Sequence, residues 1–313
     1  MPPAAPADLV ARSRDGDRAA LAKVLSLIER GGDPAREVGR LTHPAGGGAQ
    51  ILGITGAPGA GKSTLTSALV GVLREQDLRV GVLAIDPTSP FSGGAILGDR
   101  VRMGDHALDP GVFIRSMATR GHLGGLSLAT PEAMRALDAA GFDPVIVETV
   151  GVGQVEVEVA GEADTTIVVV NPGWGDAVQA NKAGLMEIAD VFVINKADRP
   201  GVDETARDIG QMLDLSVVRD WRPPVVRTTS TTGEGVDELR RVIADHRAHL
   251  ESSGELEVRR STRLRNEMHR ILAERLLLQA RALGSGDRFE ALCAKVVARE
   301  LDPWTATDTL LTP

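Results

Sequence analysis

Between residues 50 and 250, short and almost entirely apolar runs alternate with helical stretches, and this alternation restricts the chain to few folds. The runs lie at residues 51–55, 79–85, 112–115, 145–148, 165–170, 191–195 and 225–229. Nearly continuous apolar sequence, such as IVVV and VFVI, is typical of strands buried on both faces. Because strands and helices alternate, we predict an α/β fold with a mostly parallel sheet flanked by helices.

Helical patterns flank this region on both sides. Residues 8–41 carry apolar side chains at helical spacing, and the stretch HPAGGGA at 43–49 is interpreted as a flexible connector. After residue 251 the pattern is purely helical, with Leu264, Met268, Ile271 and Leu272 on one stripe that either the body of the molecule or a second subunit must cover. We therefore predict an N-terminal helical extension with linker at 1–49, the α/β domain at 50–250 and a C-terminal helical arm at 251–313.

The composition excludes several classes of protein. The single cysteine, Cys293, cannot form an intrachain disulfide and rules out zinc sites built on several thiolates. No run approaches the roughly 18 apolar residues that a membrane span requires. The net charge of -8, the absence of Tyr and an aromatic content of 3% argue against a nucleic-acid-binding surface. We expect a cytoplasmic protein that binds neither membranes nor nucleic acid.

The strongest chemical signal is the segment GAPGAGKST, which fits G-x-x-x-x-G-K-[ST] and lies between the first predicted strand and a helical run at 65–73. That context makes the fold a P-loop NTPase. Lys62 is expected to reach the β- and γ-phosphates of a nucleoside triphosphate, and the Ser63 hydroxyl to ligate Mg²⁺. The residues predicted to bind nucleotide here are Gly56, Ala57, Pro58, Gly59, Ala60, Gly61, Lys62, Ser63 and Thr64.

A second motif, N-K-x-D, predicts which base is bound. Asn195, Lys196 and Asp198 lie at the C-terminal end of the apolar strand predicted at 191–195, at the sheet edge where ligands bind. The Asp198 carboxylate can accept hydrogen bonds from N1 and the N2 amino group of guanine, whereas adenine offers it no matching donors. We also expect guanine O6 to accept hydrogen bonds from backbone N–H groups of the segment that follows the last strand, namely those of Ser230, Thr231 and Thr232. The predicted ligands are GTP and GDP with Mg²⁺.

Acidic residues at strand ends complete the predicted site. Glu148 ends a buried strand three residues before Gly151, in the place of a D-x-x-G motif, so we expect Glu148 near Mg²⁺ and the Gly151 N–H at the γ-phosphate. Asp86 ends another strand and Asp99 follows a Gly-rich stretch; both are predicted to lie near the metal. Ras-like GTPases carry a water-orienting Gln where this chain has Val152, which predicts slow unassisted hydrolysis.

Together these segments resemble one family. GAPGAGKST, AIDPTSPFSGGAILGDR, SMATRGHLGGLS, ETVGVGQ and NKAD, in this order, resemble the MeaB/ArgK family of G proteins, bacterial relatives of the human methylmalonic aciduria type A protein. The resemblance covers nearly the whole chain. It implies a GTPase chaperone that binds an adenosylcobalamin-dependent acyl-CoA mutase, methylmalonyl-CoA mutase or a relative, gates cofactor loading and protects the mutase. It also implies a homodimer formed through the C-terminal arm.

The resemblance also carries residue roles. It places the phosphate-binding lysine at Lys62 and the Mg²⁺-associated acids at Asp86, Asp99 and Glu148. A third mobile segment of the family, which couples nucleotide to mutase, maps onto residues 171–182 and makes Lys182 a candidate catalytic cation. Arg120, His122 and Gln154 belong to the resembling motifs without an assigned role. Two alternatives stay open, a metallochaperone-type GTPase and a nucleotide-gated scaffold with negligible turnover.

Overall fold

The computed structural model describes residues 4–86, 104–106, 108–118, 128–149, 154–173, 179–215 and 220–312. The chain divides into two compact units, Met1–Ser261 and Thr262–Pro313, which are described in turn.

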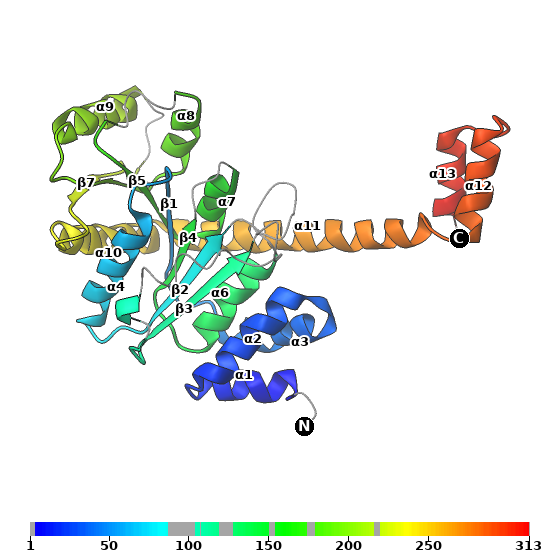
Figure 1. Ribbon diagram of the computed structural model, residues 1–313, viewed down its shortest axis with the longest axis horizontal. Coiled ribbons are helices and arrows are strands. Elements are labelled where there is room, and N and C mark those ends of the chain that lie inside the picture. Colours follow the sequence, from blue (N-terminus) through cyan, green and yellow to red (C-terminus); the bar gives the residue numbers. More distant parts are fainter. Residues whose placement is uncertain are drawn as a thin grey trace. The chain divides into compact units, whose positions relative to one another are not determined.

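The first unit is built on a seven-stranded sheet whose order is β3-β2-β4-β1-β5-β6-β7 (Figure 1). All neighbouring strands of this sheet run parallel. This confirms the predicted fold class, and each strand overlaps one of the predicted runs. The strands are β1 Ile51–Gly56, β2 Val80–Asp86, β3 Val112–Ala118, β4 Val145–Thr149, β5 Thr165–Val170, β6 Val191–Asn195 and β7 Val225–Thr228.

Side chains of the strands alternate between two apolar layers, as the pleat requires. Leu52 and Ile54 point into one layer, while Ile51 and Leu83 belong to the other. Because both layers are covered by helices, β1, β4, β5 and β6 are buried along their whole length. This double burial is the reason that the strands read as continuous apolar runs rather than alternating ones.

Helices cover the sheet on both faces. The cores show α4, Lys62–Arg74, and α10, Val236–Ser253, packed on one face, and α6, Ala129–Ala139, and α7, Gln154–Glu162, on the other. Helices α8, Gln179–Ile188, and α9, Val202–Leu215, pack on β5 and β6. The N-terminal helices lie beside α6 (Figure 1); they are α1 Pro6–Arg14, α2 Arg18–Arg30 and α3 Gly32–Thr42.

The Gly-rich connector at residues 43–49 is held in place by side chains, which differs from the flexible connector expected from its composition. It begins with a short 3-10 turn, His43–Ala45. Asp138 on α6 accepts hydrogen bonds from the backbone N–H groups of Gly47 and Ala49. The Arg260 guanidinium donates to the carbonyl oxygens of the same two residues, at 2.5 and 2.9 Å. These partners are 89 or more residues away in sequence, so no local pattern could reveal them.

Two arginines at the start of α11, Glu255–Leu283, bind the edge of the sheet where β5 and β6 begin. Arg259 forms a bidentate ion pair with the buried Asp190, with both N···O distances 3.0 Å. Arg260 binds Asp164, which is 1% exposed, at 2.8 and 3.2 Å. Paired, planar contacts of this kind orient a helix as well as stabilise it.

A buried histidine lies in the same cluster. His246 on α10 is fully buried, with its Nδ1 2.9 Å from the Thr165 hydroxyl and its ring 4.8 Å from that of Trp221. Its Nε2 is 3.5 Å from the Asp190 carboxylate. Burial lowers the pKa of His246, and the attraction of Asp190 only partly offsets that effect. The ring is therefore neutral in the folded protein at neutral pH.

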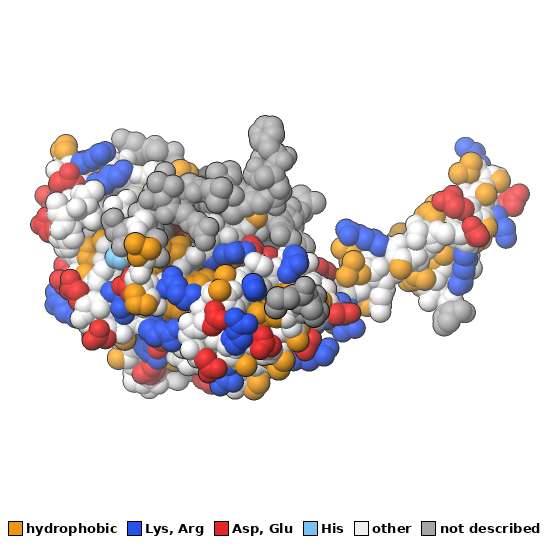
Figure 2. All heavy atoms as spheres, turned by 60° about the horizontal axis from the view of Figure 1, so that its bottom comes forward, with side chains coloured by type: hydrophobic (Ala, Val, Ile, Leu, Met, Phe, Trp, Pro, Cys, Tyr) orange, Lys and Arg blue, Asp and Glu red, His pale blue; other side chains and the backbone are white. Residues whose placement is uncertain are grey.

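The second unit contains the rest of α11 together with α12, Asp287–Val297, and α13, Pro303–Leu311. Hydrophobic side chains lie among charged ones on its surface (Figure 2). Met268 is 70% exposed, Leu272 56% and Trp304 83%, while Ala306 is the one buried apolar side chain among the residues described after Ser261. The unit thus has almost no core of its own. The domain boundaries at 49/50 and 250/251 stay predictions.

Within the described ranges, no helix combines the length and hydrophobicity needed to cross a bilayer.

Candidate functional site

The phosphate-binding segment joins the carboxyl end of β1 to the first turn of α4. Gly56 has φ +135°, and a Cβ built on it would lie 2.1 Å from the backbone oxygen of Val169. Gly61 has φ +91°, and its Cβ would lie 2.4 Å from Asn195 Nδ2. Both positions therefore require glycine, for backbone conformation and for space. This explains why the motif has glycines at its two ends.

Lys62 starts α4 and is 6% exposed. Its Nζ donates to the carbonyl oxygens of Gly56, at 2.7 Å, and Ala57, at 3.1 Å. The ammonium group is therefore held over the loop itself. A nucleotide phosphate chain that enters the loop would meet this charge within the same few ångströms.

Ser63 and Glu148 meet at the base of the loop, where both side chains are buried. The Ser63 hydroxyl donates to Glu148 Oε1 at 2.5 Å. Strand β4 lies between β1 and β2, with Glu148 paired in register to Ile54 and Ala84. Asp86 is the last residue of β2, two positions beyond Ala84, so its backbone lies at the same edge of the sheet. Hydroxyl and carboxylate oxygens are the hard donors that Mg²⁺ prefers, and these residues fit that ion.

The N-K-x-D motif is bound directly to the phosphate-binding loop. Asn195, 2% exposed, donates through Nδ2 to Ala60 O at 2.9 Å and to Gly61 O at 3.4 Å. Lys196, in the left-handed region at φ +60°, donates through Nζ to Gly59 O at 2.6 Å. The residues joined by these hydrogen bonds are 134 to 137 positions apart in the sequence, so the two motifs form one site only in the folded chain.

Asn195 also holds the loop that follows β7. Its Oδ1 accepts hydrogen bonds from the Thr228 hydroxyl at 3.2 Å, the Ser230 hydroxyl at 2.7 Å and the Ser230 backbone N–H at 3.3 Å. The Thr232 N–H donates to the carbonyl oxygen of Thr229 at 3.0 Å. Of the three predicted base-contacting positions, two therefore have N–H groups that donate within the protein. Thr231 is exposed between them, and its contact with guanine stays a prediction.

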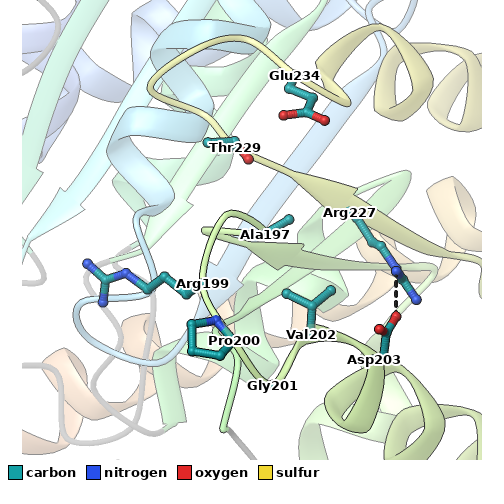
Figure 3. Close-up of a pocket in the computed structure, with 9 residues that line it drawn as sticks. All are labelled: Ala197, Arg199, Pro200, Gly201, Val202, Asp203, Arg227, Thr229 and Glu234. Atoms are coloured by element: carbon teal, nitrogen blue, oxygen red, sulfur yellow. Dashed lines mark ion pairs between the residues drawn. The ribbon is translucent and has the colours of Figure 1, made fainter.

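Asp198 is exposed at the end of the same motif, as a carboxylate that binds a ligand must be. A pocket of about 380 Å³ adjoins this segment (Figure 3). Arg227 and Asp203 face each other along it in an ion pair of 2.8 Å. Both chain neighbours of Asp198 line this pocket, whereas Asp198 itself does not. The lining residues are Ala197, Arg199, Pro200, Gly201, Val202, Asp203, Arg227, Thr229 and Glu234.

Several predicted site residues lie outside the described part of the chain. Asp99 and Gly151 are among them, as are Arg120 and His122. The side chains of Asp86, Gln154 and Lys182 are likewise not described, although Lys182 lies within α8 and Gln154 begins α7. In the described ranges, no group of three or more His, Cys, Asp or Glu side chains is arranged around a metal position.

Sequence reasoning missed the capping of the phosphate-binding loop by side chains from other strands. It predicted Lys196 as a nucleotide-binding residue, and the structure adds a hydrogen bond from the Lys196 ammonium to Gly59 O. It gave Asn171 no individual role, yet Asn171 Nδ2 lies 3.4 Å from the same Gly59 oxygen. The available signal was their position: Asn171 directly follows β5, the neighbour of β1, and Lys196 directly follows β6, the next strand of the sheet.

Comparisons with known proteins agree with this geometry. Residues 21–285 match the family profile described as "Methylmalonyl Co-A mutase-associated GTPase MeaB". A Pyrococcus horikoshii protein whose name describes it as a GTPase is 50% identical over 308 residues, which cover 97% of this chain and 96% of the relative. The mouse protein named "Methylmalonic aciduria type A homolog, mitochondrial" is 35% identical over 266 residues, 83% of this chain and 64% of that protein.

One solved structure extends the similarity to the fold. The crystal structure of a protein named LAO/AO transport system kinase superposes with a TM-score of 0.72 and 29% identity, over 99% of this chain and 97% of that one. The family profile spans most of the chain, and the phosphate-binding and N-K-x-D motifs meet in one site as GTP binding requires. The chain belongs to the MeaB family of GTPases.

Proposed function

We propose that this protein is a Mg²⁺-dependent GTPase that acts as a G-protein chaperone for an adenosylcobalamin-dependent acyl-CoA mutase, methylmalonyl-CoA mutase or a relative. In this role it gates cofactor loading and protects the mutase. The name of the matching family and that of the mouse relative support the client. The single cysteine, Cys293, suits a reducing compartment, and we place the protein in the cytoplasm.

The observation that carries the nucleotide assignment is the hydrogen bonding of Asn195 and Lys196 to the phosphate-binding loop. In this arrangement a base recognised by Asp198 and a triphosphate held by residues 56–64 belong to one ligand. Lys62 would bind the β- and γ-phosphates. The amides of Thr231 and Gly151 would contact guanine O6 and the γ-phosphate.

When bound, Mg²⁺ would be held by Ser63, Glu148, Asp86 and Asp99 and would neutralise charge on the phosphate oxygens. Lys182 supplies a further positive charge, which stabilises the negative charge that develops on the phosphoryl group during its transfer. With Val152 in place of a water-orienting Gln, turnover by the isolated protein is slow. A mutase that orders the segment around Lys182 then accelerates it without contributing a residue.

Exposed apolar side chains of the second unit support a homodimer. Residues 262–313 bury almost no apolar surface of their own, and a helical hairpin without a core does not hold together in water. The stripe of Met268 and Leu272 is the surface we assign to the partner subunit.

Two substitutions test the nucleotide assignment. Asp198→Asn should lower GTP affinity about a hundredfold or more, because two charge-assisted hydrogen bonds are lost, and should raise affinity for xanthosine triphosphate. Asp245→Asn, an exposed acid on α10, is the matched control. Unchanged GTP affinity in Asp198→Asn would refute the base assignment.

Lys62→Ala should reduce GTP turnover about a hundredfold or more, with Lys23→Ala as an exposed control. The client is tested by measuring GTP turnover alone and with purified candidate mutases, with complex formation followed by light scattering. Turnover that rises in a verified complex supports the chaperone role. Turnover that stays negligible in such a complex would instead make the protein a nucleotide-gated scaffold.

A further inference from the structure

The three residues that follow β5 lie between two parts of the nucleotide site. Asn171 Nδ2 approaches the carbonyl oxygen of Gly59 in the phosphate-binding loop at 3.4 Å. Two residues on, the Gly173 N–H donates to the Thr205 hydroxyl on α9 at 3.1 Å, and Thr205 is 2% exposed. Gly201, just after the N-K-x-D motif, lies against the same stretch, since its Cβ would be 3.7 Å from Gly173 N. The start of the β5–α8 connection thus contacts both the phosphate loop and the region behind the base-recognition motif.

The carbonyl of Gly59 is the point where these contacts converge. It accepts from Lys196 Nζ at 2.6 Å as well as from Asn171. Gly59 has φ +75°, a conformation in which its peptide could turn with little steric resistance. A carbonyl dipole that turned into the loop would point its oxygen at the phosphates and repel them. The two side chains therefore keep the loop in an anion-binding conformation.

Asn171 and Lys196 hold that carbonyl in different ways. Lys196 makes the shorter, charge-assisted hydrogen bond from a long side chain, whereas the Asn171 amide is on a short side chain that directly follows a buried strand. Asn171 Oδ1 is buried and accepts no hydrogen bond within the described ranges. The one hydrogen bond that this half-buried side chain makes within the described ranges is therefore the one from its amide to Gly59.

We infer that Asn171 is a positioning residue of the nucleotide site, which holds the Gly59 carbonyl through its amide while Thr205 anchors the segment that carries it. The inference rests on the proposed binding of guanine nucleotide by the phosphate loop. It has a consequence for regulation, because coupling free energies are reciprocal. Whatever displaces Asn171 from Gly59 changes the nucleotide affinity of the loop, and nucleotide binding favours the arrangement in which the two are in contact by the same factor.

The test is the dissociation rate of a fluorescent GDP analogue from the full-length protein in the presence of Mg²⁺. Asn171→Ala should release the analogue about three- to tenfold faster, the effect of losing one modest hydrogen bond. Asn171→Asp has nearly the same shape, but its carboxylate cannot donate to Gly59 and attracts the Lys196 ammonium away from it. Release from Asn171→Asp should therefore be at least as fast as from Asn171→Ala.

Thr205→Val, which removes the acceptor for Gly173 with little change of shape, should accelerate release by a smaller factor in the same direction. Asn266→Ala, an exposed asparagine on α11, is the matched control and should release like the wild type. Thermal unfolding of each nucleotide-free variant verifies that it is folded.

Two results would overturn the inference. One is release from Asn171→Ala within twofold of the wild type. The other is wild-type release from Asn171→Asp together with fast release from Asn171→Ala, which would mean that the side chain acts only by packing. If Asn171→Ala does not fold, release from Asn171→Asp within twofold of the wild type would also overturn the inference. A wild-type protein that binds no guanine nucleotide would refute the proposed function instead.

Discussion

Replacement of Asn195 by alanine should destabilise the protein even when no nucleotide is present. The side chain is 2% exposed, and it makes three hydrogen bonds of 2.7 to 3.2 Å and two longer ones of 3.3 and 3.4 Å. A net contribution of about 0.5–1.5 kcal/mol for each of the three shorter bonds, with a further penalty for the buried Ser230 group left unpaired, gives about 3–5 kcal/mol. At about 2–4 °C per kcal/mol for a domain of this size, the melting temperature should fall by roughly 6–20 °C.

The assay is urea unfolding of nucleotide-free protein followed by circular dichroism, with Asn266→Ala as the control. Asn195→Asp is the informative companion, because it preserves shape while directing an oxygen at the carbonyl groups of Ala60 and Gly61. We expect it to be at least as destabilising as Asn195→Ala. A free energy of unfolding within 1 kcal/mol of wild type for both variants would refute the reasoning, as would a loss seen only when GDP is added.

Three further predictions concern pH, metal and assembly. Burial lowers the pKa of His246 below its ordinary value of 6.5, so the unfolded chain takes up the proton more readily than the folded one. The free energy of unfolding, measured by urea unfolding between pH 5 and 7.5, should therefore fall as the pH drops below about 6.5. This part of the pH dependence should disappear in His246→Gln. Ser63→Ala, which removes the hydroxyl 2.5 Å from Glu148, should raise the Mg²⁺ concentration for half-maximal GTP turnover by roughly tenfold, and an unshifted titration would contradict the metal assignment. Leu272→Glu should convert the proposed homodimer to monomer in light scattering, and a dimer that persists would place the interface elsewhere.

The fold was predictable because local chemistry encodes it. Strands buried on both faces must be apolar throughout, so runs such as residues 165–170 and 191–195 coincide with β5 and β6 residue for residue. Gly56 and Gly61 likewise predict the phosphate-binding turn from local requirements, because each has a positive φ and no room for a Cβ.

The order of the strands and the contacts between their ends were not predictable in this way. The N-K-x-D motif predicts that Lys196 binds nucleotide, but no local pattern shows that its ammonium donates to Gly59, 137 residues away. Asn171 begins the segment at 171–182 but has no individual role in it, and Thr205 belongs to no motif; the contact of Asn171 with Gly59 depends on β5 being the neighbour of β1 in the sheet. The connector at 43–49 shows the same limit, because its composition suits a flexible linker while Asp138 and Arg260 hold it.

By itself, then, the sequence determined the α/β class, the phosphate-binding loop, the base-recognition motif and the family, all of which depend on residues near one another along the chain. Only the tertiary structure decided which side chains brace that loop and which polar groups are buried together. The physical reason is that backbone conformation and burial pattern are local properties, whereas a hydrogen bond between Asn195 and Ala60 exists only once the parallel strands have been placed side by side.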